Sequence, residues 1–290
     1  MIAFVTSAEA RELDEDMAPL CGAMLQLGVP HQVVVWDDPN VDWGTFSAAI
    51  IRSTWDYHTR IDEFLAWVDR TAGLTRLIND RQMLHWNTDK SYLMDLDEAG
   101  IPIVPTDFIR TALVIGERVD VAGAKWENVV VKPTVSAGSN DTKRHMSHDG
   151  AVTHIRELIG RGKSVMVQPY QDAIDEHGET AMVYMGGEFS HAFYKGPILA
   201  NGGNENRNSL FVEETIRSHS ATSDQRVIGD RVMSYLKSKF DDLPLYARVD
   251  LVPSIDGPRL LELEVTEPSL YFSTAPGSVD RFAAMCANRA

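Results

Sequence analysis

Cysteine is scarce in this chain of 290 residues, and the only two, Cys21 and Cys286, lie near opposite ends of it. Two cysteines are too few for a disulfide framework, which favours a reducing compartment. We therefore expect a cytoplasmic protein. Long apolar runs are also missing, which argues against a membrane-spanning helix. The stretch up to Asp16 has one short apolar run, and we interpret it as a first strand, not as a signal peptide.

Basic residues are few: 27 Lys and Arg stand against 42 Asp and Glu, and the formal net charge is -15. Without a basic stripe to neutralise phosphates, nucleic acid is not an expected partner. An anionic ligand must therefore be held by a few local cations, helped by a metal ion. Internal repeats and low-complexity tracts are absent, and the length allows two or three packed subdomains.

Strands and helices are expected to alternate in about the first 85 residues, a small unit by the usual size of domains. Such alternation favours an α/β unit with a parallel sheet. Gly28 and Pro30 follow the first helix in the order expected at a helix end. The expected strands are 2–5, 31–36 and 48–52, and the expected helices are 9–27 and 62–71.

The rest of the chain mixes short strands, helices and turns. Residues 79–87 are expected to be a connection, after which Thr88 or Asp89 caps a helix that runs to Ala99. Two loops, 133–140 and 200–208, are rich in small residues and are expected to cover a site. The other expected helices are 111–119, 150–160 and 224–240, and the strands are 128–132, 164–168, 245–252 and 259–265, with a hairpin over 178–195.

Charged residues alternate along the last two expected strands. Residues two apart in a strand share a face, so Arg248 lies beside Asp250, and Glu262 beside Glu264. If the strands pair, three carboxylates converge, and a cation between them would relieve their repulsion. Oxygen ligands of this kind suit Mg²⁺. The alternative is a solvent-exposed face of alternating charge.

Three lysines are candidates for binding phosphate. Lys132 ends a strand and precedes a loop with Ser136, Gly138 and Ser139, whose small side chains let backbone N–H groups approach an anion. Lys90 opens the expected helix, where a cation opposes the helix dipole and a ligand role is more attractive. Lys195 ends the hairpin. The alternative for each lysine is an ordinary surface position.

The segment 51–58 is the most unusual stretch of the sequence. It leaves the third expected strand at its carboxyl end, where α/β sheets bind ligands, and a guanidinium there can hold a carboxylate. Arg52 and Asp56 have two open roles, contact with the substrate or shaping of the cleft, and the alternative is a polar loop anchored by Trp55. The candidate substrate contacts are Arg52, Ser53, Thr54, Asp56 and Tyr57.

Several other motifs are incomplete. The Gly162-Lys163-Ser164 stretch lacks the first glycine of a P-loop and leads into a strand instead of following one. No G-x-G-x-x-G follows the first strand, and no G-x-S-x-G occurs, which leaves dinucleotide binding and serine hydrolysis unsupported. His145 and His148 have no cysteine partners and are interpreted as loop residues.

In order and spacing, these elements resemble the ATP-grasp superfamily over nearly the whole chain. The motifs that carry the resemblance are Asn87–Lys90, Val130–Pro133 with Ser136–Ser139, Val165–Tyr170, Gly178–Thr180, Asp250, and Glu262 with Glu264. The resemblance implies an N-terminal α/β domain followed by an ATP-grasp fold that is α+β in its C-terminal half. The implied ranges are 1–86 on the substrate side, 87–168 with the phosphate flap, and 169–290 with the metal site.

The resemblance also implies ligands. ATP would contact Lys90, Lys132, Lys195, Ser136, Gly138 and Ser139 through its phosphates, and Gln168 and Tyr170 at the adenine hinge. Glu179 would contact the ribose, with Asp175 or Glu176 as alternatives. Two Mg²⁺ ions would bind Asp250, Glu262 and Glu264, although relatives commonly have Asn at the last position.

Within the superfamily, the segments IRSTWDYH, VQPY, GGEFSHAFYKGP and LELEVTEPSLYF are similar to those of the cycloserine-forming ligases. That likeness implies a cyclo-ligase that activates the carboxylate of a small amino-acid-like substrate as an acyl phosphate, with Arg248 and Lys195 as catalytic residues. An intermolecular carboxylate–amine ligase and a non-catalytic nucleotide-binding module are the alternatives. The sequence leaves a homo-oligomer open.

Overall fold

The structure is a computed structural model, and it describes residues 1–110, 119, 121–199, 210–211 and 214–289. The expected helix 111–119, apart from Val119, and the expected mobile loop 200–208 lie outside the described residues. None of the described helices is long and apolar enough to cross a bilayer.

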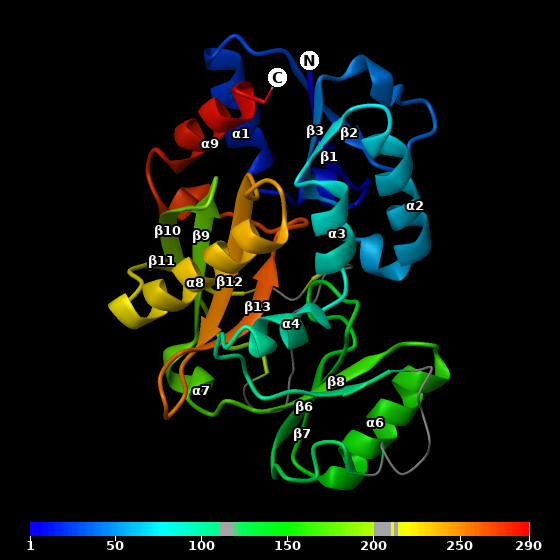
Figure 1. Cartoon of the computed structure of the whole chain (residues 1–290), viewed down its shortest axis with the longest axis vertical. Helices are drawn as coiled ribbons and strands as arrows, with labels where there is room; N and C mark the ends of the chain where they lie inside the picture. The colour runs from blue at the N-terminus through cyan, green and yellow to red at the C-terminus, as the bar shows by residue number, and fades with distance from the viewer. Residues whose placement is uncertain (111–118, 120, 200–209, 212–213, 290) are drawn as a thin grey trace.

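Three sheets form the frame of the molecule (Figure 1). The first has the order β2-β1-β3-β4, the second β5-β8-β6-β7 and the third β11-β10-β9-β12-β13. The strands are β1 Ile2–Thr6, β2 His31–Val35, β3 Ala48–Ser53, β4 Arg76–Ile78, β5 Asp107–Ile109, β6 Val129–Pro133, β7 Lys143–His145, β8 Val165–Pro169, β9 Glu179–Met185, β10 Glu188–Lys195, β11 Ile216–His219, β12 Tyr246–Val252 and β13 Arg259–Glu264.

Helices connect and cover these sheets. The described α-helices are α1 Met17–Gln26, α2 Ile61–Ala72, α3 Arg81–Asn87, α4 Tyr92–Glu98, α6 His148–Gly160, α7 Ile174–His177, α8 Ser223–Lys239 and α9 Ser278–Ala287. In Figure 1 the first sheet lies at the top, the third sheet in the middle, and the second sheet with α6 at the bottom.

The first sheet is parallel, as the alternating pattern predicts. Every residue of β1 and β3 is buried, which explains why both strands begin with a continuous apolar run, 2–5 in β1 and 48–51 in β3, instead of an alternating pattern. The other two sheets are antiparallel. The fold is therefore mixed α/β, with its antiparallel sheets in the C-terminal part, as expected.

The predicted helix 9–27 is wrong in its first half. Only one 3-10 turn, Ala10–Glu12, forms there, and α1 begins at Met17. The chain turns because Asp16 is buried and its carboxylate accepts the backbone N–H groups of Leu270 (2.6 Å) and Phe272 (2.9 Å). Leu13, in the part of the range that is not helical, is 38% exposed.

The predicted connection 79–87 is also wrong, because α3 forms there. Asp80 caps it by accepting the backbone N–H of Met83 at 2.8 Å, a signal that the sequence contained. The next helix, α4, begins only at Tyr92. Lys90 therefore lies between two helices, and the argument that it opposes a helix dipole does not apply.

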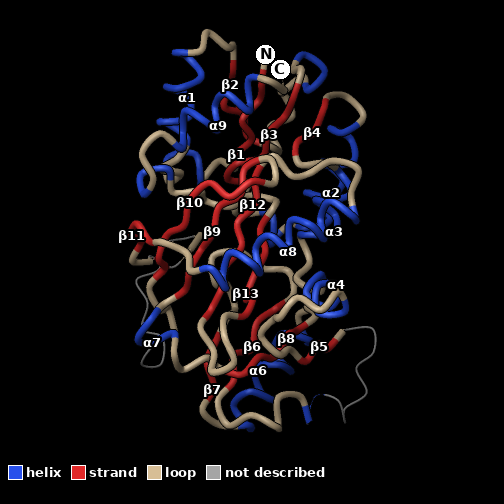
Figure 2. The backbone as a smooth tube through the Cα atoms, turned by 60° about the vertical axis from the view of Figure 1, so that its left-hand side comes forward, coloured by secondary structure: helices blue, strands red, loops and turns tan. Residues whose placement is uncertain are grey.

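The C-terminal segment returns to the first sheet. Helix α9 packs against α1, and a single apolar core joins residues of β1, α1, β9 and α9. The Asn79 side chain adds a polar joint, donating to the carbonyl oxygens of Tyr246 (3.0 Å) and Val265 (2.7 Å). The two termini consequently lie at one end of the molecule (Figure 2). The first and third sheets are thus packed as one unit.

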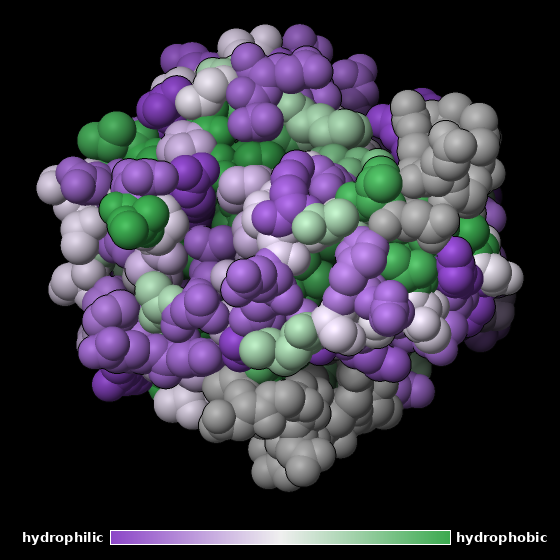
Figure 3. All heavy atoms as spheres, turned by 90° about the horizontal axis from the view of Figure 1, so that it is seen from below, coloured by the Kyte–Doolittle hydropathy of each residue, from purple (hydrophilic) through white to green (hydrophobic). Residues whose placement is uncertain are grey.

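The opposite end of the molecule is formed by the second sheet and α6. In its described part, hydrophilic side chains dominate and apolar ones are scattered in small groups (Figure 3). Scattered apolar side chains are normal on a surface that faces water.

Candidate active site

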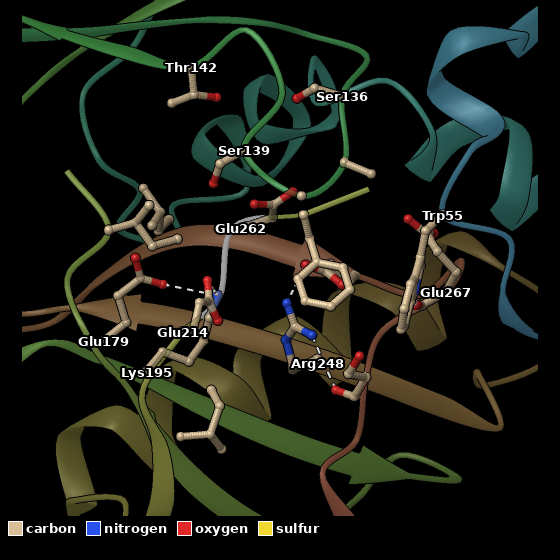
Figure 4. A pocket seen from close by; sticks show the side chains of 18 of the residues that line it. Trp55, Ser136, Ser139, Thr142, Glu179, Lys195, Glu214, Arg248, Glu262 and Glu267 are labelled. Carbon is tan, nitrogen blue, oxygen red and sulfur yellow. Dashed lines mark hydrogen bonds and ion pairs between the residues drawn. The ribbon is translucent and has the colours of Figure 1, made fainter. Parts of the chain in front are cut away.

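A cavity of about 810 Å³ opens where the three sheets meet (Figure 4). Its floor is formed by β10, β12 and β13, its cover by the loop after β6, and its side wall by the segment after β3 and the chain after β13. Lys90, Lys132 and Lys195 all line it, as do Glu179, Glu262 and Glu264. The structure thus brings these six predicted site residues together.

Lys195 is surrounded by carboxylates. Its Nζ lies 3.0 Å from Asp250, 3.3 Å from Glu179 and 3.7 Å from Glu214. Burial alone would lower the pKa of Lys195, but Asp250 and Glu179 hold it well above the ordinary value. The ammonium group therefore stays charged, which suits a residue that neutralises phosphate.

Arg248 and Asp250 form a buried bidentate pair. Nε donates to Oδ1 at 2.9 Å and Nη2 to Oδ2 at 3.0 Å, and Nη2 also contacts Glu264. Burial would raise the pKa of Asp250, but Arg248 and Lys195 lower it to about 2. The two strands do pair, and their register places Arg248 opposite Glu264 and Asp250 opposite Glu262.

The other two lysines differ in their partners. Lys90 Nζ lies 2.9 Å from Glu262 and donates to the Ser136 carbonyl oxygen at 2.5 Å. Lys132, only 8% exposed, has no hydrogen bond or ion pair from its Nζ among the described residues. Burial lowers the pKa of Lys132, and Glu262 partly offsets that effect. A buried cation on a cavity wall, with no partner in the described part of the chain, favours an anionic ligand.

Of the three expected metal ligands, Glu262 and Glu264 line the cavity, whereas Asp250 is 1% exposed and lies beneath its floor. Each of the three carboxylates is turned towards a cation. Within the described part of the chain, no three His, Cys, Asp or Glu side chains are gathered as a ready-made metal site. Mg²⁺ keeps water ligands and takes others from phosphates, so an all-protein cage is not required. The oxygen donors of Asp250, Glu262 and Glu264 therefore fit magnesium in chemistry.

One end of the cavity has an apolar wall around the predicted hinge. Val104, Ile174 and Leu261 line it beside Gln168 and Tyr170. The Gln168 amide donates to Thr106 Oγ1 at 2.9 Å, and this contact orients the amide. Of the three candidate ribose acids, only Glu179 lines the cavity. Asp175 instead contacts the Tyr170 hydroxyl, and Glu176 is exposed.

The loop with Ser136, Gly138 and Ser139 covers the cavity. Gly138 has a φ of +56°, and a Cβ there would collide with the Leu210 carbonyl oxygen, so glycine is required. Asn140 at the end of the loop approaches His58 Nε2 at 3.2 Å. The cover is thereby tied to the segment after β3.

The predicted substrate segment divides into two sets. Tyr57 and Trp55 line the cavity, whereas Arg52, Ser53, Thr54 and Asp56 do not. Arg52 is fully buried behind the wall, where it donates to the Pro268 carbonyl oxygen at 3.2 Å and stacks over Tyr246. Asp56 accepts from the Trp36 ring at 3.0 Å and pairs with Arg60. For Arg52 and Asp56 this geometry favours the second role, shaping of the cleft.

Sequence reasoning missed several residues that line the cavity, among them Glu214, Glu267, Ser269 and Tyr271. The last three belong to the run LELEVTEPSLYF, in which only the first two glutamates were singled out. A lone acid next to proline gives no periodic signal. Glu214 follows the glycine-rich stretch and gave no signal either.

Known proteins share this architecture over the full length of the chain. Residues 2–79 match the family described as D-cycloserine synthetase DcsG, N-terminal domain. The cycloserine biosynthesis protein DcsG of Streptomyces lavendulae is 35% identical over 297 residues, covering 100% of this chain and 98% of that protein.

Solved structures agree. A crystal structure of D-cycloserine synthetase DcsG has a TM-score of 0.91 at 34% identity and covers 99% of each chain. The D-alanyl-alanine synthetase A of Vibrio cholerae has a TM-score of 0.71 at 15% identity, covering 99% of this chain and 97% of that one. The latter likeness shows the ATP-grasp fold alone.

Proposed function

The chain belongs to the DcsG family of ATP-grasp ligases, ATP-dependent enzymes that form C–N bonds, and from that premise we propose that it converts O-ureido-D-serine into D-cycloserine. The observation that carries the proposal is the cavity in which Lys90, Lys132 and Lys195 surround one space beside paired carboxylates. Such a site can hold the phosphates of ATP next to a small carboxylic acid.

The proposed reaction has three steps: phosphorylation of the carboxylate, ring closure, and removal of the carbamoyl group. The substrate carboxylate attacks the γ-phosphate of ATP, ADP leaves, and an acyl phosphate forms. The ureido nitrogen attached to oxygen then attacks the acyl carbon, loses its proton and displaces phosphate. One water molecule removes the carbamoyl group, which leaves as carbon dioxide and ammonia. Because the nucleophile is in the same molecule, ring closure benefits from a high effective concentration and needs no second substrate site.

The residues of this chain would act mainly by position and charge, the general solution for phosphoryl transfer. Lys90, Lys132 and Lys195 neutralise the phosphates, and Arg248 stabilises the oxyanion that develops at the acyl carbon. Magnesium, two ions by the family resemblance, would be held by Asp250, Glu262 and Glu264 and would supply further neutralisation of phosphate charge.

Water must be kept away from the acyl phosphate. We propose that the cover with Ser136 and Ser139 serves this purpose, since Asn140 ties it to His58 on the opposite wall. The boundaries 1–86, 87–168 and 169–290 and a cytoplasmic location remain part of the proposal. Limited proteolysis with sequencing of the fragments tests the boundaries.

The reaction is tested by measuring magnesium-dependent phosphate release from ATP with and without O-ureido-D-serine, with products identified by mass spectrometry. ADP, phosphate and cycloserine are the expected products. Phosphate release that requires two added compounds would instead favour an intermolecular carboxylate–amine ligase. Binding of ATP without turnover on any acid would indicate a nucleotide-binding module.

A further inference from the structure

Glu267 is a buried acid for which the reaction so far has no use. Its side chain lines the cavity, and the residue is only 7% exposed. Its carboxylate makes no hydrogen bond and no ion pair with any of the residues that the structure describes. Figure 4 shows Glu267 beside Trp55, on the far side of Arg248 from Lys195 and Glu179.

The backbone around Glu267 is held from several directions. Trp55 Nε1 donates to the Glu267 carbonyl oxygen at 3.2 Å, and Arg52 donates to the next carbonyl, that of Pro268, also at 3.2 Å. Arg248 Nη1 donates to the Ser269 carbonyl oxygen at 3.1 Å. All these contacts fix the main chain and leave the carboxylate itself unbound. The acid is therefore positioned without being neutralised.

The surroundings of Glu267 disfavour an isolated negative charge. Burial raises its pKa well above the ordinary value, and Glu264 and Glu262 raise it further. Lys90 and Arg248 act in the opposite direction, but both are already bound to other carboxylates, Lys90 to Glu262 and Arg248 to Asp250. A cationic group on a ligand would supply the partner that the protein does not.

We propose that Glu267 binds the ammonium group of the substrate and thereby selects α-amino acids over acids that lack the amine. The assignment rests on the function proposed above, because an α-ammonium group is one carbon away from the carboxylate that is phosphorylated. Figure 4 shows Glu267 near Arg248, on the side away from Lys195 and Glu179, so a substrate whose carboxylate lies at Arg248 can turn its ammonium group towards Glu267.

Asp14 is the main competitor for this role. It lines the same cavity, is 8% exposed, and its Oδ2 has no hydrogen bond among the described residues. Burial raises the pKa of Asp14, but the charge of Arg52 counteracts this effect. Because Arg52 already offsets its charge, Asp14 needs an external cation less than Glu267 does.

The test compares two substrates on three variants. O-ureido-D-serine and 3-(ureidooxy)propionic acid, which lacks only the amine, are assayed with the wild type, Glu267→Gln, Asp14→Asn and the exposed control Glu188→Gln. We expect Glu267→Gln to lower kcat/KM for the amine substrate by about 10- to 100-fold, the usual effect of losing a hydrogen bond between charged groups. Its kcat/KM for the des-amino acid and its KM for ATP should stay within about 3-fold of the wild type.

Stability separates this role from a structural one. Glutamine has the shape of glutamate but no charge to bury, so the ligand-free Glu267→Gln variant should melt at or above the wild-type temperature. A lower melting temperature together with equal losses on both substrates would mean that Glu267 supports the fold. If Asp14→Asn, and not Glu267→Gln, removes the preference for the amine, the assignment is overturned.

The outcome for Glu267 is separable from the outcome for the proposed function. A wild type that makes cycloserine, with a Glu267→Gln variant that keeps the full amine preference, overturns the amine assignment alone. A wild type inert towards O-ureido-D-serine overturns the proposed reaction. The same comparison is then made with α-amino acids that stimulate phosphate release and their des-amino counterparts, and if none stimulates it, both proposals fail.

Discussion

The two ends of the cavity differ in the sign of the buried charge that lacks a partner among the described residues. At the end with Lys195, every carboxylate on the floor faces a cation, and the one buried charge without a partner among the described residues is the ammonium group of Lys132. At the end with Trp55, the carboxylate of Glu267 is buried without such a partner. One end thus lacks an anion and the other lacks a cation. The difference fits a phosphate at one end and an ammonium group at the other.

The largest effect is expected from removing a cation at the Lys195 end. Lys195→Met should lower the rate of phosphate release by about 10²- to 10³-fold, because a charge aimed at the transferred phosphate is lost. It should also lower the free energy of unfolding by about 3 kcal/mol, since Glu179 and Glu214 are left without their cation.

Enzyme assays and urea unfolding measure the two effects of Lys195→Met, with the exposed Lys237→Met as the matched control. A variant with more than a tenth of wild-type activity would show that this end does not depend on its charge balance.

A structural effect is expected at the other end. Arg52→Met removes the contact with Pro268 and leaves Asp16, 3.7 Å away, without its buried cation. We expect the free energy of unfolding to fall by about 3 kcal/mol, with the KM for ATP unchanged.

Arg60→Met is the control for Arg52→Met, because Arg60 lies just after the segment 51–58 and its ion pairs with Asp37 and Asp56 are partly exposed to water. Its loss should therefore lower the free energy of unfolding by less than about 1 kcal/mol. If the Arg52→Met variant is stable but has a strongly raised KM for the substrate, the result would favour the other role of Arg52, direct contact with the substrate.

His58, which Asn140 of the cover approaches, should make the stability of the protein depend on pH. Burial, and then the nearby Lys163, lower the pKa of His58 from 6.5 to about 4. Between these values the unfolded chain binds a proton that the folded chain does not, so the contribution of His58 to stability is complete above pH 6.5 and is lost as the pH falls towards 4.

His58→Gln removes this contribution. Between pH 7 and pH 5, the wild type should lose up to about 2 kcal/mol more unfolding free energy than the variant. Urea titrations of both proteins at the two pH values measure these losses. Subtracting the loss of the variant from that of the wild type removes the contribution of the cavity acids, which is the same in both proteins. Equal losses in both proteins would mean that His58 is protonated in the folded state.

The smallest effect is expected at the apolar wall. Gln168→Glu installs the acid that the family often has at the hinge, but it removes the amide donor to Thr106, whose hydroxyl already donates to the Val104 carbonyl oxygen. We expect the KM for ATP to rise about 3- to 10-fold, the effect of one lost hydrogen bond, with kcat unchanged. A lower KM for ATP would show that the acid is the better hinge residue here as well.

Local patterns predicted much of the frame. The alternation of strands and helices predicted the parallel sheet, and the period of two along 245–252 and 259–265 predicted that Arg248 shares a face with Asp250 and Glu262 with Glu264. Patterns failed where a distant contact decided the local structure. Helix α1 begins late because Asp16 is held by residues 270–272, and no window of the sequence around Asp16 contains that partner.

By itself, the sequence determined the parallel strands of the first sheet and which face of the last two strands carries the charges, because strand and helix periods are set by neighbouring residues. It also determined the order of the ligand-binding motifs along the chain. Only the tertiary structure decided that Arg52 supports the wall instead of lining the cavity, that Lys132 has no ion pair among the described residues, and that Glu267 lies at the end opposite Lys195. Burial and charge pairing depend on contacts between side chains from different sheets, and such long-range contacts produce no local pattern in the sequence.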